Sequence, residues 1–164
     1  MNRPTHEEHI NKIQQLLARP QKETAAIMIP FYLFYRKIFG GMSEQLKNMH
    51  DLTNSEIDVL GTLHASEADH TLSPTQLYQQ LLFSSGGMTK VLARLEAKGA
   101  IERVENPGDR RSKLVRLTDD GKCILENAIV TALSYEGRYL DALNHSEKEH
   151  FRILLEKLLA SDPG

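Results

Sequence analysis

The residues best able to do chemistry are basic ones that cluster in one stretch of the chain. Residues 84–117 hold eight basic and four acidic side chains, although all 164 residues together carry a formal charge of −2. The basic members are Lys90, Arg94, Lys98, Arg103, Arg110, Arg111, Lys113 and Arg116. Because lysine and arginine pair with phosphates and carboxylates, a cationic segment in an acidic protein indicates a surface for a polyanion. Charge alone leaves the identity of that polyanion open.

The sequence offers little for catalysis or metal binding. No serine–histidine–aspartate or paired-carboxylate arrangement has supporting context, and the SSGG at residues 84–87 lies between two expected helices, which is the wrong place for a phosphate-binding loop. The sequence His6-Glu7-Glu8-His9 does not match the HExxH pattern of zinc hydrolases, and although two histidines three apart can chelate a metal, no third ligand is set by the spacing. For the single cysteine, Cys123, we favour a small hydrophobic role over redox sensing, because Asp119 and Asp120 disfavour a thiolate. We therefore expect no enzyme, cofactor or metal.

Two capping boxes begin helices just before the basic stretch. Thr53 with Glu56, and Ser73 with Gln76, have the spacing at which each side chain accepts the other's backbone N–H. Apolar residues at helical spacing follow both boxes, and the first of these helices is expected to end before residue 69. A third helix is expected to begin with Met88 and to close at Lys98 and Gly99.

Beyond residue 99 the apolar period changes to two. Ile101–Glu105 and Leu114–Leu117 flank the sequence NPGDRRSK, which predicts a β-hairpin with a charged tip. Thr118 is expected to cap a helix that runs towards Asn144. A last helix carries an apolar stripe that needs a partner surface; its members are Phe151, Leu154, Leu155, Leu158 and Leu159.

Two further helices are predicted near the N-terminus, over residues 6–18 and about 23–48. Pro20 is expected to end the first. The second is apolar on nearly every side around residues 27–39, so more than one surface must cover it. Pro30 predicts a kink or a helix start, and Gly40-Gly41 is a second weak point.

Two short helices across a turn, followed by a hairpin with a basic tip, form a winged helix-turn-helix. The expected fold is thus mainly α with a small β-wing. A helix fits the major groove of DNA, and a basic hairpin beside it can reach the neighbouring minor groove. The basic stretch coincides with these two elements.

The residues of this region resemble the MarR family of bacterial winged-helix regulators. The resemblance rests on LTNSEIDVLGTL at residues 52–63 and above all on RLEAKGAIERVENPGDRRSKLVRLTDDG at residues 94–121. It implies three parts: dimerisation helices in residues 1–50, a DNA-binding domain in 51–118, and C-terminal dimerisation helices in 119–164. It also implies a homodimer on a pseudo-palindromic operator, usually a repressor and often released by a small ligand or an oxidant.

The resemblance assigns DNA contacts to two helices. Thr89 and Lys90 begin the exposed face of the recognition helix and are candidates for base edges, and Arg94 lies one turn on. Hydroxyl and amide side chains at two helix starts are candidates for phosphate contacts: Ser73, Thr75, Gln76, Ser84 and Ser85.

The family pattern also assigns roles in the wing. Arg111 is the expected minor-groove residue and Asp109 its orienting partner, while Arg110 and Lys113 would meet phosphates. The alternative is that these residues form only a charged turn exposed to solvent. The winged-helix pattern around the turn makes this alternative less favoured. For the strand residues Arg103 and Arg116, surface solubility is as good an explanation.

An effector pocket is a second expectation. Tyr32, Tyr35 and Arg36 lie on the aromatic helix, where Arg36 could pair with the carboxylate of an aromatic acid between tyrosine rings. Asp58 and His64 would complete the pocket. The alternatives are packing in the dimer core for the tyrosines, and a hydrogen-bonded core histidine for His64.

We therefore expect a cytoplasmic, homodimeric regulator of transcription, a ligand-responsive repressor that binds double-stranded DNA. The chain has no apolar run of the roughly 20 residues that span a membrane, and its polar N-terminus does not resemble a secretory signal. The alternative function is a winged-helix module for protein interaction without specific DNA binding. The basic tip of the hairpin argues against that alternative.

Overall fold

The computed structural model of the chain describes residues 15, 18–67, 69–81, 85–109 and 111–161, with only the backbone described at 19, 20, 85 and 86. The chain divides into two compact units, Met1–Met42 and Ser43–Gly164. The helix predicted over residues 6–18 lies outside the described residues. The division into 1–50, 51–118 and 119–164 stays a prediction about function.

Helix α2 (Arg19–His50) is one continuous element that includes Pro30 and both glycines at 40 and 41. It begins earlier than the expected residue 23, and of the two alternatives expected at Pro30 it excludes a helix start, because the helix continues through this residue. A proline in a helix removes one hydrogen bond and costs about 3 kcal/mol. The other turns of a helix of 32 residues outweigh that cost.

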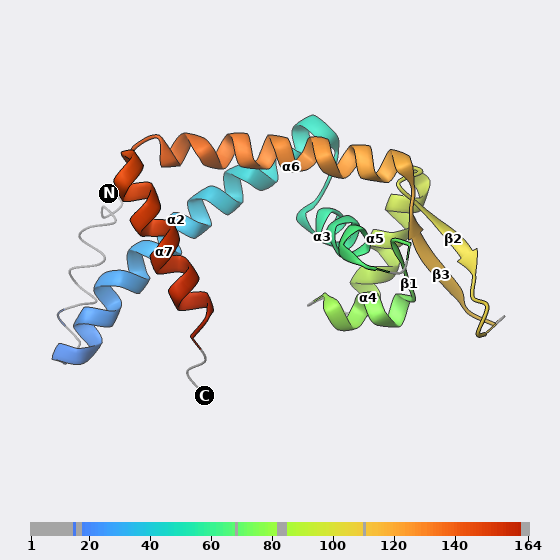
Figure 1. The fold of residues 1–164 in the computed structure, drawn as a ribbon, viewed down its shortest axis with the longest axis horizontal. Helices are drawn as coiled ribbons and strands as arrows, with labels where there is room; N and C mark the ends of the chain where they lie inside the picture. Colours follow the sequence, from blue (N-terminus) through green and yellow to red (C-terminus); the bar gives the residue numbers. More distant parts are fainter. Residues whose placement is uncertain (1–14, 16–17, 68, 82–84, 110, 162–164) are drawn as a thin grey trace, which may run out of the picture. The chain divides into compact units, whose positions relative to one another are not determined.

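The second unit contains the predicted winged helix (Figure 1). Helices α3 (Asn54–Ala65), α4 (Pro74–Gln80) and α5 (Ser85–Ala97) precede strands β2 (Ile101–Glu105) and β3 (Lys113–Leu117). The hairpin pairs in antiparallel register with Arg103 opposite Val115. A third strand, β1 (Thr71–Leu72), pairs with β3 to give the order β1-β3-β2.

Both capping boxes are confirmed. The Thr53 and Ser73 side chains each accept the backbone N–H three residues on, and the side chain of that later residue accepts the N–H of Thr53 or Ser73 in return. Gly99 takes the predicted left-handed conformation, with φ of 69°, just after the end of α5. That helix begins at Ser85 rather than at Met88, so Gly86 and Gly87 are helical. The N–H groups of a first turn have no intrahelical partners, so the first turn tolerates glycine. The helix can therefore begin before the two glycines.

The core of the winged helix is a set of fully buried aliphatic side chains. They come from α3, α4, α5 and the sheet, so each element contributes one apolar face to the same interior. The members that are 0% exposed include Val59, Leu60, Leu63, Leu77, Leu95 and Val115. This packing fixes which faces of α4 and α5 remain exposed.

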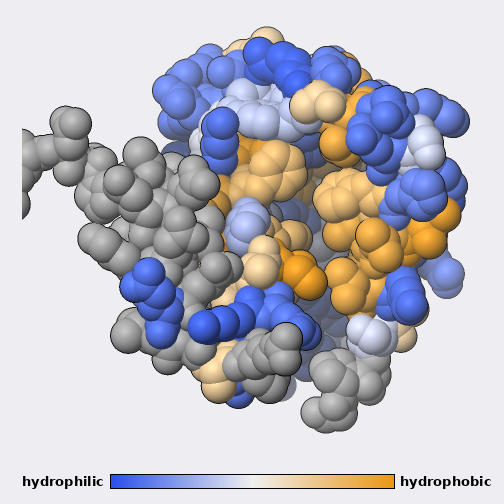
Figure 2. Space-filling view, turned by 90° about the vertical axis from the view of Figure 1, so that its left-hand side faces the viewer, coloured by the Kyte–Doolittle hydropathy of each residue, from blue (hydrophilic) through white to orange (hydrophobic). Residues whose placement is uncertain are grey.

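Helices α6 (Asp119–Leu140) and α7 (His145–Leu159) complete the second unit. The long helix ends before Asn144, which instead caps α7 by accepting the Glu147 N–H at 3.0 Å. Many apolar side chains of these two helices are exposed: Ile129, Val130, Leu133, Phe151, Ile153, Leu154, Leu158 and Leu159. Figure 2 shows apolar side chains gathered in patches that hydrophilic ones border. None of the helices in the described residues is long and apolar enough to cross a membrane.

Candidate nucleic-acid interface

Helix α5 presents one face to the core and the opposite face to solvent. Met88 and Leu92 are buried, at 4% and 2% exposed. The exposed positions Thr89, Lys90 and Ala93 are spaced so that they share one face of the helix. Ala93 was not among the predicted contacts. In a DNA major groove, an exposed alanine can make an apolar contact with a thymine methyl group.

The start of α4 offers further polar groups. The Gln76 side chain accepts the Ser73 N–H at 2.8 Å, and the Gln76 N–H donates to the Ser73 hydroxyl at 3.2 Å. The capping box therefore holds both predicted side chains in place, while Thr75 is exposed. Ser84 lies outside the described residues, as does the side chain of Ser85.

The tip of the wing is shaped by two side chains that bond to the backbone. The Asn106 carboxamide oxygen accepts the Gly108 N–H at 3.0 Å, and its nitrogen donates to the Ser112 hydroxyl at 2.9 Å. The Asp109 carboxylate accepts the backbone N–H of Arg111 at 3.0 Å. The predicted orienting partner thus bonds to the main chain of the residue it was expected to orient. Asn106 was missed, although asparagine before Pro-Gly is a known turn signal.

Positive charge at the tip differs from positive charge on the strands. Arg111 and Lys113 are exposed, and Arg110 lies outside the described residues. On the strands, Arg116 pairs with Glu102 at 2.8 Å and Arg103 lies 3.7 Å from Glu96. Neighbouring carboxylates therefore offset the strand charges, which fits the solubility role left open for these two residues.

Arg94 lies in a cluster of charged residues that the sequence did not predict. Its Nε atom donates to Glu56 Oε1 at 3.1 Å, and the Glu56 side chain is 0% exposed. Lys98 lies 3.4 Å from the same oxygen. Arg94 and Lys98 also approach the Asp51 carboxylate, at 3.7 and 3.5 Å. We call these four residues, Asp51, Glu56, Arg94 and Lys98, the corner cluster.

The two carboxylates of the corner cluster both favour the charged form. Burial disfavours the Glu56 carboxylate, yet the hydrogen bonds from Thr53, the charge of Lys98 and the hydrogen bond from Arg94 together hold its pKa below the usual value. A hydrogen bond from Lys47, with the nearby charges of Lys98 and Lys47, lowers the pKa of Asp51. Both carboxylates are therefore ionised at neutral pH.

The predicted effector residues belong to different units. Tyr32, Tyr35 and Arg36 lie in the first unit and are exposed. Asp58 and His64 lie in the second, and desolvation raises the pKa of the Asp58 carboxyl. His64 is not the buried, hydrogen-bonded core histidine offered as an alternative, because it is exposed. Its ring stacks on that of His70, with centroids 5.2 Å apart.

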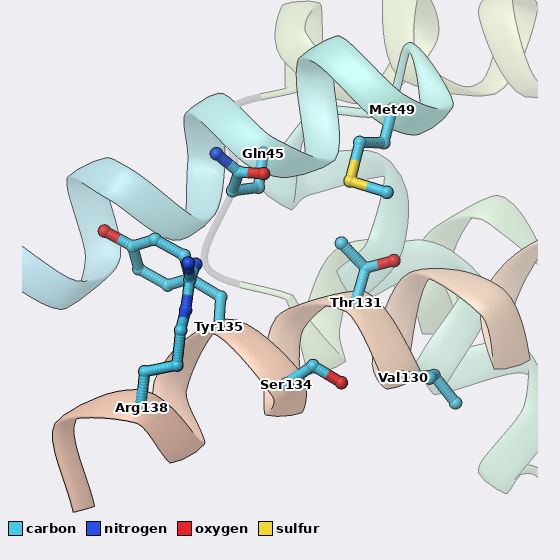
Figure 3. A pocket seen from close by; sticks show the side chains of 7 residues that line it. All are labelled: Gln45, Met49, Val130, Thr131, Ser134, Tyr135 and Arg138. Carbon is cyan, nitrogen blue, oxygen red and sulfur yellow. The ribbon is translucent and has the colours of Figure 1, made fainter. Parts of the chain in front are cut away.

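A cavity of about 390 Å³ lies between the last turns of α2 and the C-terminal half of α6 (Figure 3). Arg138 stacks over the ring of Tyr135 at 4.6 Å, so one wall offers both a cation and an aromatic face. The lining residues are Gln45, Met49, Val130, Thr131, Ser134, Tyr135 and Arg138. None of the predicted effector residues lines this cavity.

Neither metal nor cofactor chemistry gains support from the described residues. Within them, no three histidine, cysteine, aspartate or glutamate side chains are grouped so that they could hold a metal ion. Cys123 is exposed on α6, and the Asn127 side-chain nitrogen lies 3.5 Å from its sulfur.

Three helices and a three-stranded sheet, with a basic tip on the hairpin that follows the third helix, define a winged helix-turn-helix protein. Residues 50–112 match the model of the MarR family. The chain is 30% identical over 115 residues to PecS, an HTH-type transcriptional regulator of Dickeya dadantii, a match that covers 70% of this chain and 69% of PecS. The chain belongs to the MarR family. Its curated relatives are regulators of transcription, which confirms the expectation that it is not an enzyme.

Solved structures of MarR from E. coli share this fold. A mutant MarR is 28% identical, covering 81% of this chain and 96% of its own, with a TM-score of 0.71. A mutant MarR complexed with operator DNA is 26% identical, covering 87% of this chain and 99% of its own, with a TM-score of 0.63.

Proposed function

We propose that this protein regulates transcription by binding a specific double-stranded operator as a homodimer, most simply as a repressor. The observation that carries the proposal is the exposed face of α5 with Thr89 and Lys90, followed in the chain by a hairpin whose tip presents Arg111 and Lys113. The solved complex of the similar MarR with operator DNA supports it. The action of such a repressor in the cytoplasm, where its operator lies, is part of the proposal.

In this proposal the two elements read adjacent grooves. Helix α5 enters the major groove, where Thr89 and Lys90 contact base edges and Ala93 contacts a thymine methyl. The wing reaches the neighbouring minor groove with Arg111, whose charge favours narrow A·T-rich stretches. The predicted phosphate contacts, which fix the register on the duplex, are Ser73, Thr75, Gln76, Ser84, Ser85, Arg110 and Lys113.

The apolar surface that the chain leaves exposed supports homodimerisation. Leu133 on α6 is 61% exposed, and Leu154 and Leu158 on α7 are 58% and 66% exposed. Surfaces of this kind are typical of subunit interfaces. A two-fold dimer presents two recognition helices roughly 34 Å apart, which matches a pseudo-palindromic site.

Release by a small aromatic acid is the regulatory part of the proposal. Tyr32, Tyr35, Arg36, Asp58 and His64 remain its predicted contacts. A ligand that dissociates the complex must bind the DNA-free form more tightly than the DNA-bound form. Aromatic carboxylates are therefore expected to raise the midpoint of thermal unfolding and to weaken operator binding, and Arg36→Gln should remove both effects together. Retention of both in Arg36→Gln would exclude this site.

Selection of bound duplexes from a random DNA pool tests the function directly. A specific regulator enriches one motif with two-fold symmetry. A winged helix that binds only proteins enriches none, and that result would establish the alternative function.

A further inference from the structure

The corner cluster connects three segments of the second unit. Asp51 follows the last turn of α2, Glu56 lies in the first turn of α3, and Arg94 and Lys98 lie at the end of α5. Arg94 and Lys98 are four residues apart, so they project from the same side of the recognition helix. Both cations therefore point to the corner between α2 and α3.

The Glu56 carboxylate has a partner on each of its oxygens. Oε2 accepts the Thr53 N–H at 2.8 Å and the Thr53 hydroxyl at 2.9 Å. Oε1 accepts Nε of Arg94 at 3.1 Å, with the Lys98 ammonium 3.4 Å away. A carboxylate that is 0% exposed requires such partners, because an unpaired buried charge is strongly unfavourable. The first turn of α3 thus depends on α5 for part of its electrostatic balance.

Asp51 extends this contact to the main chain of the corner. It has a φ of 51°, in the left-handed region that residues other than glycine seldom occupy. Its carbonyl oxygen accepts a hydrogen bond from Lys98, and Nη2 of Arg94 lies 3.5 Å from the same oxygen. These bonds tie the end of α5 to the main chain of the corner.

We propose that Glu56 is a positioning residue for operator recognition, and that Arg94 and Lys98 act on DNA only through it. The cluster fixes the angle at which α5 presents Thr89, Lys90 and Ala93 to the bases. This inference rests on the proposed function and differs from a direct contact of Arg94 with DNA. It assigns the cluster to discrimination between sequences rather than to the attraction of phosphates.

Binding measurements on the operator and on a scrambled duplex, each at several salt concentrations, test this inference. Glu56→Gln, which keeps an oxygen for the Thr53 N–H, and Arg94→Gln are each expected to lower the operator-to-scrambled affinity ratio about tenfold, the effect of one mismatched base pair. The double variant should lose no more than the worse single variant, because both changes remove one interaction. The salt slope should not change.

Glu102→Gln is the matched control. It removes the partner of Arg116, an ion pair of 2.8 Å on the sheet, without changing a contact of α5, and should leave the affinity ratio unchanged. If Glu56→Gln does not fold, Arg94→Gln and Lys98→Gln decide, since they change side chains that are 39% and 23% exposed. The loss of affinity ratio in the variant that carries both changes should then differ from the sum of the two single losses.

Three results would overturn the inference. In the first, Arg94→Gln lowers the salt slope by about one and loses equal affinity for the operator and the scrambled duplex, as expected when a phosphate contact is removed. Another is an unchanged ratio in folded Glu56→Gln. The third is additive losses in the double variant. Absence of any operator preference in the unaltered protein is a different outcome, because it overturns the proposed function itself.

Discussion

Replacement of Arg111 by alanine is expected to weaken operator binding more than tenfold while the fold stays intact. The minor groove concentrates negative potential, so a guanidinium inserted there contributes more than an exposed charge elsewhere. The tip itself is shaped by the Asn106 and Asp109 side chains, which bond to Gly108 and Ser112 and to the backbone of Arg111. The Arg111 side chain is therefore dispensable for folding. Mobility-shift titrations at matched salt, with thermal unfolding beside them, measure both quantities.

Lys113→Ala provides the contrast from the same hairpin. A lysine that meets only phosphate adds affinity for every sequence, so its loss should weaken operator and scrambled duplexes alike and reduce the salt slope by roughly one. An Arg111→Ala protein with unchanged operator affinity would remove the wing from the recognition scheme.

Replacement of Gly121 by alanine is expected to destabilise the protein by about 1–3 kcal/mol, the usual range for an overpacked core position. A Cβ at this position would overlap the Ala100 carbonyl oxygen and would lie 2.8 Å from Leu117 Cδ1. The Ala100 carbonyl is held in place because it accepts the Thr118 N–H at 3.1 Å. Helix α6 would have to shift away from the end of the recognition helix.

Gly137→Ala is the control from the same helix. A Cβ at residue 137 meets nothing within 4 Å, and alanine is favoured over glycine in a helix by roughly 0.5–1 kcal/mol. Chemical denaturation of the two variants should therefore give opposite changes in the free energy of unfolding. Equal stabilities would refute the close packing of α6 on Ala100.

Local signals in the sequence predicted most of the winged helix. The boxes at Thr53 and Ser73 and the left-handed glycine at 99 act within a few residues, so their side chains decide the backbone wherever the segment lies. The period of two around the Pro-Gly turn predicted the hairpin for the same reason. The expected roles of Thr89, Lys90 and the wing came from the family resemblance and stay predictions.

Features that depend on distant residues could not be predicted in this way. Strand β1 has two residues, too few for a period, and forms because β3 offers an edge. The bond between Glu56 and Arg94 joins residues 38 positions apart, and nothing in their spacing links them. Arg94 was predicted as a DNA contact because only its charge and its helix position were visible in the sequence.

Helix α5 is proposed to bind the major groove and the wing the neighbouring minor groove. DNA footprinting tests this arrangement most directly. Methylation of guanine N7 reports the major groove, and hydroxyl-radical cleavage reports the minor groove. On the selected operator we predict two patches of major-groove protection about one helical turn apart, each beside a patch of minor-groove protection. Arg111→Ala should remove only the minor-groove protection. Protection of one groove only, or an Arg111→Ala footprint identical to that of the unaltered protein, would contradict this arrangement.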